Sequence, residues 1–164
     1  FRPQAVEKRN RFGDWEGDTL GAIKTDQEKI FGLIERKTRY LLLAKVARLK
    51  YAMDGCKELL HPYHNLFQTL TLDNGVENIR YQELNIDTYF CHPYSSWEKG
   101  AIENGFQRLR RFIPKKAALK NYSNDDIIGI ADRMNDTPRK CLNWKTPKEL
   151  FQAELNKLGV AFQG

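Results

Sequence analysis

Residues 13–23 of the chain, GDWEGDTLGAI, predict a strand whose two faces differ in chemistry. Asp14, Glu16 and Asp18 stand at alternate positions, so an extended backbone places all three on one face. Acidic side chains in a strand that otherwise reads as buried are costly unless they are paired or bind a metal ion. This stretch is therefore both the first expected structural element and the first candidate for a functional site.

Four more strands are expected, at 29–38 and 39–46 and then at 67–75 and 86–93. The turns joining the first three strands are short enough to make them antiparallel neighbours. The last two strands are separated by helical segments, and such crossovers produce parallel pairing. The expected fold is α/β, with a mixed five-stranded sheet of three antiparallel strands and two parallel additions, flanked by helices.

The expected helices are recognised by apolar spacing and by their ends. Residues 51–63 carry apolar side chains at helical spacing, and Pro62 is expected to end that helix. A short helix is expected over 77–85, and capped helices begin at Ser123 and Thr146. One apolar stripe ends before Pro114 and is expected to pack on the sheet: Ile102, Phe106, Leu109 and Ile113.

The chain has 164 residues with 41% hydrophobic content, enough for one domain spanning 1–164, with residues 1–12 as a lead-in. No stretch approaches the ~20 apolar residues of a membrane span, and no secretory signal opens the chain. The chain begins without Met, so we expect a piece of a longer protein. Three scattered cysteines suit a reducing cytoplasm and are expected to be buried or half-buried thiols: Cys56, Cys91 and Cys141.

Positive charge is concentrated in one part of the chain. The window 99–120 carries seven Lys and Arg against one acid, Glu103, so it holds the whole net charge of +6. Such a region is typical of a surface that binds a polyanion, and a solvated helix face is the alternative. The candidate contacts are Lys99, Arg108, Arg110, Arg111, Lys115 and Lys116, together with Arg139 and Lys140 in a later loop.

Three acids in separate elements are the candidate metal ligands. Asp18 lies inside the first strand, Asp73 at the end of the fourth, and Glu103 on the helix after the fifth. We expect the first and fourth strands to be neighbours, so that the two aspartates lie side by side. Hard carboxylates suit Mg²⁺ or Mn²⁺. A third carboxylate would complete a site for two ions ~3.5–4 Å apart, the arrangement used in phosphoryl transfer.

Each of these acids also has a structural interpretation. Asp73 precedes Asn-Gly and could bond the backbone of a turn. Asp18 could belong to a polar strand face. Glu103 could be an ordinary helix charge paired one turn away. The three interpretations together still leave two acids unexplained inside apolar strands.

Six stretches together resemble the catalytic domain of DDE transposases of the insertion-sequence thirty family, whose RNase H-like fold is shared with retroviral integrases. They are GDWEGDT (13–19), ERKTRY (35–40), TLDNGVE (71–77), YFCHPYSSWEKGAIEN (89–104), LRRFIPK (109–115) and NDTPRKCLNWKTPKEL (135–150). The departures are Asn78, where an aromatic residue is common, and Ile102, where a polar residue often stands.

The resemblance implies a catalytic and metal-binding triad of Asp18, Asp73 and Glu103. It implies Mg²⁺ or Mn²⁺ as cofactor, two ions with substrate bound, and cleavage and joining of DNA strands during transposition. Transposon ends and target DNA would be the partners, with a homodimer or larger assembly acting at the nucleoid of a bacterium. The helix-turn-helix segments of the family are not matched, so the chain resembles the catalytic core alone. The alternatives are a DNA-binding or assembly module with an inactive triad and an RNase H-like nuclease.

Several further residues have competing interpretations. Glu16 and Glu77 could assist the site or be ordinary surface charges. Glu98 is a rival third ligand, although SSWE fits a capping box with Ser95. Trp97 and Tyr94 could stack on an unpaired base or pack their loop onto the core. A zinc cluster of Cys56, His61 and His64 matches no familiar spacing, and His92 is expected to form hydrogen bonds.

Overall fold

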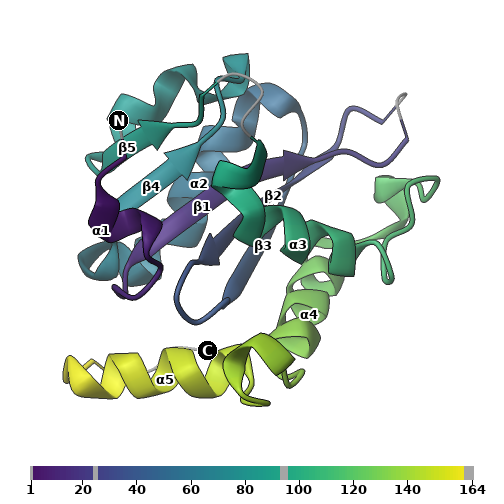
Figure 1. Cartoon of the computed structure of the whole chain (residues 1–164). Helices are drawn as coiled ribbons and strands as arrows, with labels where there is room; N and C mark the ends of the chain where they lie inside the picture. The colour runs from purple at the N-terminus through teal and green to yellow at the C-terminus, as the bar shows by residue number, and fades with distance from the viewer. Residues whose placement is uncertain (1, 24–25, 93–95, 161–164) are drawn as a thin grey trace.

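A computed structural model describes residues 2–23, 26–92 and 96–160, and its centre is a mixed five-stranded sheet (Figure 1). The strand order is β3-β2-β1-β4-β5. The first three strands pair antiparallel, and β4 and β5 add in parallel to β1. The predicted sheet is therefore confirmed. The strands are β1 (Asp14–Leu20), β2 (Lys29–Glu35), β3 (Leu41–Val46), β4 (Thr69–Leu72) and β5 (Asp87–Phe90).

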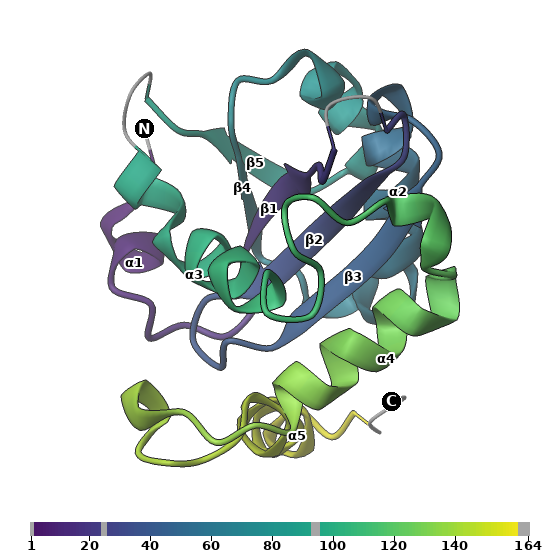
Figure 2. The ribbon, with the colours of Figure 1, turned by 90° about the vertical axis from the view of Figure 1, so that its right-hand side faces the viewer.

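Helices cover both faces of the sheet, with α2 and α3 on opposite sides (Figure 2). The α-helices are α1 (Gln4–Glu7), α2 (Ala52–Leu60), α3 (Gly100–Leu109), α4 (Asn124–Asn135) and α5 (Pro147–Lys157). Short 3₁₀ turns join them: η1 (Leu49–Tyr51), η2 (His61–Leu66), η3 (Val76–Leu84), η4 (Ser96–Lys99), η5 (Leu119–Asn121) and η6 (Lys140–Leu142). None of the described helices is long and apolar enough to cross a membrane.

Two predicted helical segments differ from the structure. The chain continues helically past Pro62 as η2, because a proline in the first turn of a helical segment removes an N–H that has no partner there. The short helix expected over 77–85 is the 3₁₀ segment η3, which is interrupted at Arg80. The capped starts at Ser123 and Thr146 are confirmed, each by a reciprocal capping box.

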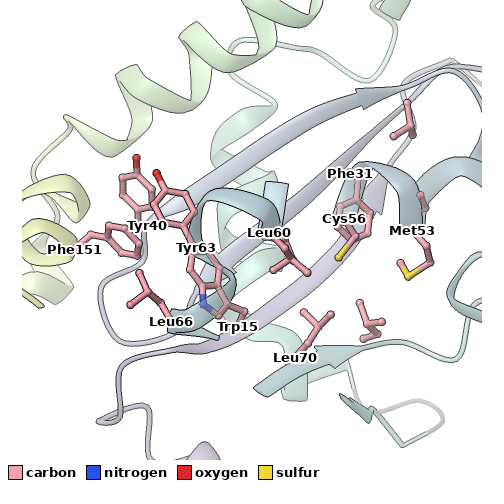
Figure 3. Close-up of a cluster of buried hydrophobic side chains, with 14 of the residues drawn as sticks. Trp15, Phe31, Tyr40, Met53, Cys56, Leu60, Tyr63, Leu66, Leu70 and Phe151 are labelled. Atoms are coloured by element: carbon pink, nitrogen blue, oxygen red, sulfur yellow. The ribbon is translucent and has the colours of Figure 1, made fainter. Parts of the chain in front are cut away.

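An aromatic cluster fills the core on the α2 face of the sheet (Figure 3). Trp15 of β1 stacks on Phe67 with ring centroids 4.5 Å apart. Phe151 of α5 stacks on Tyr40 at 4.2 Å and meets the edge of Tyr63 at 5.6 Å. These contacts anchor the C-terminal helix to the sheet, since buried aromatic pairs contribute beyond their apolar area.

The opposite face of the sheet buries the predicted apolar stripe of α3. Ile102, Leu109 and Ile113 are fully buried there, and Phe106 is nearly so. Gly32 of β2 makes this packing possible, because a Cβ at that position would stand 2.7 Å from Cε1 of the Phe106 ring. Gly32 also pairs with Asp18 across the β1–β2 ladder. The close approach therefore places α3 directly beside Asp18.

Adding a single methyl at Gly32 should test this packing. We expect Gly32→Ala to lower the free energy of unfolding by about 1–3 kcal/mol, because the Phe106 ring must shift in a dense core. The matched control is Gly129→Ala in α4, where nothing lies within 4 Å of the added Cβ. That change should stabilise by about 0.4–1 kcal/mol. Denaturant unfolding measures the free energy of unfolding of both variants. Equal changes for Gly32→Ala and Gly129→Ala would mean that the packing of α3 does not depend on this contact.

Candidate active site

Two aspartates on neighbouring parallel strands form the centre of the site. Glu16 of β1 stands opposite Thr71 of β4 in the register. Asp18 lies two residues beyond Glu16, inside β1, and Asp73 lies two residues beyond Thr71, directly after β4 ends at Leu72. The structure therefore brings together the two acids that the sequence predicts to lie side by side.

A lysine ammonium lies between these two carboxylates. Nζ of Lys99 is 3.0 Å from Oδ2 of Asp18 and 3.3 Å from Oδ2 of Asp73. Lys99 is only 5% exposed. Burial opposes its charge, but the two carboxylates outweigh that cost and raise the pKa of the ammonium above its usual value. Lys99 was predicted to contact a polyanion, whereas the structure places it against the acid pair.

The remaining oxygens of the two aspartates are held by backbone and side-chain donors. Oδ1 of Asp18 accepts the Thr19 N–H at 2.8 Å. Oδ1 of Asp73 accepts the Gly75 N–H at 3.3 Å and the Asn78 amide at 2.8 Å. Asp73 therefore has two roles: its Oδ1 holds the turn after β4, and its Oδ2 faces the site. Asn78 is buried and orients Asp73, a role that the sequence analysis missed.

Glu103 follows Lys99 by one turn of α3 and is half-buried. It lines a pocket of about 280 Å³ that also contains Leu20, Arg110 and Lys115. Its carboxylate makes no hydrogen bond or ion pair with the residues that the structure describes. Among those residues, no group of three His, Cys, Asp or Glu side chains is arranged to hold a metal ion. Two of the three predicted ligands therefore converge, and Glu103 stands apart from them.

Glu16 is fully buried beside the site and holds the start of α3. Its Oε1 pairs with Nε of Arg36 at 2.8 Å. Its Oε2 accepts the N–H groups of Ala101 and Ile102 at 2.8 and 3.0 Å. A carboxylate is favourable at this position, because the first N–H groups of a helix carry partial positive charge and lack intrahelical partners. Glu16 thus positions α3 directly, and with it Lys99. The buried Arg36 in turn pairs with Glu16, a contact that the sequence did not predict.

The other acidic candidates point elsewhere. Oε1 of Glu98 is 2.9 Å from Nδ1 of His92, and its Oε2 accepts the His92 N–H at 2.8 Å, so both oxygens of this carboxylate are engaged by His92. The carboxylate of Glu77 lies against Gly75: its Oε2 occupies the space into which a Cβ on Gly75 would project. Tyr94, Ser95 and the side chain of Trp97 lie outside the described residues.

The basic candidates divide into exposed and buried groups. Arg110 donates through Nη2 to the Gly21 carbonyl at 2.6 Å, and its buried Nη1 has no partner among the described residues. Burial lowers the pKa of this guanidinium. Arg139, predicted as a polyanion contact in a loop, is buried. The exposed group comprises Arg108, Arg111, Lys115, Lys116 and Lys140.

The cysteines and histidines form no metal centre within the described ranges. Cys56 is buried, and burial raises the pKa of its thiol. Cys91 is also buried, which raises its pKa to about 11. Cys141 is exposed, so the expectation of a buried or half-buried thiol is wrong for this residue. Nδ1 of His64 contacts the carbonyl of His61 rather than a thiol.

Similarity to known proteins supports a common origin with transposases. The chain is 38% identical to the transposase of insertion sequence IS4351 from Bacteroides fragilis, over 98% of this chain and 51% of the relative. It is 38% identical to the IS1086 transposase of Cupriavidus metallidurans, over 92% and 46%. It is 33% identical to transposase InsI of IS30A from Escherichia coli, over 92% and 41%. The chain thus spans about half the length of the curated relatives it matches, and no family model matches it.

The fold is that of integrase catalytic cores. The catalytic core domain of BIV integrase superimposes with a TM-score of 0.66 at 16% identity, covering 90% of this chain and 99% of that one. A chain from the structure of the simian T-cell lymphotropic virus intasome in complex with PP2A regulatory subunit B56 gamma superimposes with a TM-score of 0.67 at 15% identity, covering 84% of this chain and 53% of that one. The predicted RNase H-like architecture and the predicted relationship to insertion-sequence transposases are both confirmed.

Proposed function

We propose that this chain, whose homologues are IS30-family and other insertion-sequence transposases, is a transposase catalytic core that cleaves and joins DNA strands with divalent metal ions. One observation carries the proposal. The Oδ2 atoms of Asp18 and Asp73 both lie within 3.3 Å of a single cationic nitrogen. Two carboxylates that already share one cation, one inside a strand and one directly after the end of its neighbour, are suited to a metal-dependent polynucleotidyl transferase.

The residues that would hold the metal are Asp18, Asp73 and Glu103. Their donors are all carboxylate oxygens, which Mg²⁺ and Mn²⁺ prefer, and the Lys99 ammonium stands in for a cation between two of them. When bound, the metal ions would activate the attacking water or 3′-hydroxyl and stabilise charge on the leaving oxygen. Glu103 would have to turn its side chain toward the aspartates to act as the third ligand.

Residues around the acids supply positioning and positive charge. Asn78 and Gly75 hold Oδ1 of Asp73, so that Oδ2 keeps its direction toward the site. Lys99 lies beside both aspartates and, if released from them, would be a cation available to the reacting phosphate. Arg110 and Lys115 line the pocket beside Glu103 and would bind phosphates next to the reacting bond. A charged surface fixed before DNA arrives needs little rearrangement during the reaction.

The ammonium between the acids also favours a second candidate function. If Lys99 stays there permanently, the chain is a DNA-binding or assembly module that binds no catalytic metal. The two functions differ in what happens when a divalent ion competes with the ammonium. In a catalytic core the aspartates would bind the divalent ion in place of the Lys99 ammonium, whereas in an inactive module they would keep the ammonium.

Removing the ammonium should therefore strengthen metal binding. We expect Lys99→Met to bind Mn²⁺ on the order of tenfold more tightly than wild type, because no internal cation then competes for the aspartates. Isothermal titration without DNA measures this directly. Lys57→Met is the matched control, because Lys57 also pairs with an acid, Glu83, but at the surface. Mn²⁺ binding that is absent from both wild type and Lys99→Met would favour the inactive module.

The partner of this activity is DNA, and we infer that several copies act together on it. One structural neighbour was solved as an intasome. Transposon ends and target DNA at the nucleoid of a bacterial cell would be contacted by the exposed cations Arg108, Arg111, Lys115, Lys116 and Lys140. Light scattering of the chain with and without duplex DNA tests assembly. A mass for the complex that includes only one copy would contradict it.

A further inference from the structure

A second cationic pocket lies on the flank of α3 that faces away from the acid pair. Its volume is about 240 Å³, and it is bounded by α3, the β2–β3 turn and the loop between α4 and α5. Arg39, Arg108 and Arg139 line it, one from each of these three parts. Ile34 and Gly105 are also part of its lining. Within the described part of the chain, no acid lines this pocket and none forms an ion pair with these arginines.

Arg139 is held in this pocket with part of its guanidinium group unpaired. The residue is only 7% exposed, and its buried Nε has no hydrogen-bond partner among the described residues. Its Nη2 donates to the carbonyl of Met134 at 3.2 Å. Burial, with Arg108 and Arg39 nearby, lowers its pKa. A buried cation with an unsatisfied N–H is costly, so the arrangement lacks an anionic acceptor.

The loop that carries Arg139 is built to fix it. The Arg139 N–H donates to the Lys145 carbonyl at 3.0 Å, and its own carbonyl accepts the N–H groups of Leu142 and Trp144, each at 2.9 Å. Asn143 and Trp144 adopt positive φ angles of 53° and 65° to close the loop. Backbone strain at two non-glycine residues is retained only where the surroundings over-determine it. The loop from Arg139 to Lys145, which the acid site does not use, thus fixes the position of Arg139.

We propose that this pocket binds a phosphate of the DNA backbone, away from the reacting phosphodiester. Guanidinium groups bind phosphate oxygens through paired, charge-assisted hydrogen bonds, and three of them converge here without a competing carboxylate. The inference rests on the proposed function, and it adds Arg39 and a defined binding pocket to the DNA surface. It also explains why Arg139 is buried although it belongs to a basic loop.

The placement on α3 favours DNA over a small free anion. Lys99 and Glu103 lie on one flank of the helix, whereas the pocket residues lie on the other: Ala101, Asn104, Gly105 and Arg108. An α-helix is about 10–12 Å across, so a strand that crosses its exposed face can reach both flanks. Arg111 is exposed between them. Successive phosphates of one strand could therefore occupy the pocket and approach the acid pair.

The experiment measures how affinity for a short fluorescent duplex DNA falls with salt. Each phosphate contact contributes about 0.9 to the slope of log affinity against log salt. We expect the magnitude of this slope to fall by about 0.9 in the double variant Arg39→Gln with Arg108→Gln, since both arginines face the same phosphate. Arg48→Gln with Lys50→Gln is the matched control, because these exposed cations lie beyond the opposite end of β3. An equal decrease of the slope in the control would overturn a shared phosphate site. So would a decrease of about 1.8 in the double variant, because two separate phosphate contacts would then have been lost.

A second measurement identifies the source of the phosphate and separates the two proposals. Inorganic phosphate, compared with chloride at equal ionic strength, should raise the melting temperature of wild type but not of the double variant. If the melting temperature responds in this way while the DNA slope is unchanged, the site binds free phosphate and the DNA assignment is wrong. If wild type joins DNA strands and neither response depends on the pocket, the inference fails and the proposed function stands. If Mn²⁺ supports no strand joining by wild type but the DNA slope depends on the pocket, the proposed function fails and the phosphate site stands.

Discussion

Asp73→Asn should lower metal-dependent DNA strand joining by at least about 10²–10³-fold, the effect of removing one preorganised charge from a phosphoryl-transfer site. The substitution keeps the turn, because Asn retains an oxygen that can accept from Gly75 and Asn78. It replaces the oxygen that faces Lys99 with an amide. Because this ion pair is partly exposed, we expect stability to change by no more than about 1 kcal/mol.

Strand joining is measured with labelled transposon-end DNA in Mg²⁺ or Mn²⁺, alongside thermal unfolding of the same preparations. Asp87→Asn is the matched control: it removes the same charge at the start of β5, opposite Thr69 at the other end of β4. Asp87→Asn should keep wild-type activity. Activity retained by a folded Asp73→Asn variant would refute the assignment of Asp73 as a metal ligand.

Glu16→Ala should cost about 3–5 kcal/mol of unfolding free energy, the largest stability effect expected in this chain. It would leave the Arg36 guanidinium buried without its carboxylate, since neither side chain of this pair is more than 1% exposed. It would also remove the acceptor for two N–H groups at the start of α3, Ala101 and Ile102. The loss combines an unpaired buried charge with unsatisfied donors.

Chemical denaturation measures this cost, with Glu58→Ala as the control. Glu58 is exposed on α2, and its removal should change stability by no more than about 0.5 kcal/mol. A double variant, Glu16→Leu with Arg36→Met, should recover part of the loss, because it buries no unpaired charge. Equal stabilities for Glu16→Ala and Glu58→Ala would show that Glu16 does not hold α3.

The parts of the fold that sequence patterns could predict are those set by local chemistry and connection length. Short turns favour antiparallel neighbours and helical crossovers favour parallel ones, so the order of elements predicts the directions of pairing. The adjacency of β1 and β4 is an expectation beyond this rule, and the structure confirms it. That pairing is what brings Asp18 and Asp73 together. The apolar spacing from Ile102 to Ile113 likewise identifies the buried face of α3 without knowledge of its partner strands.

The site details that could not be predicted depend on which charges meet across the fold. Lys99 and Glu103 are one turn apart, so the sequence shows that they share a helix flank, but it does not show which of them reaches the aspartates. Glu16 and Arg36 are 20 residues apart and meet only because β1 and β2 pair and α1 and α3 cover them. No local pattern marks Asn78 as the partner of Asp73, because a side chain in a 3₁₀ segment after a turn can point in many directions.

The most direct measurement is the anomalous diffraction from crystals of this chain soaked in Mn²⁺. If Asp18 and Asp73 form a catalytic metal site, an anomalous peak should lie between their Oδ2 atoms, with Nζ of Lys99 displaced from its 3.0 Å contact with Asp18. Glu103 should then turn toward the same peak. An absence of anomalous signal at this position, with Lys99 still between the two carboxylates, would contradict the proposed metal-dependent site.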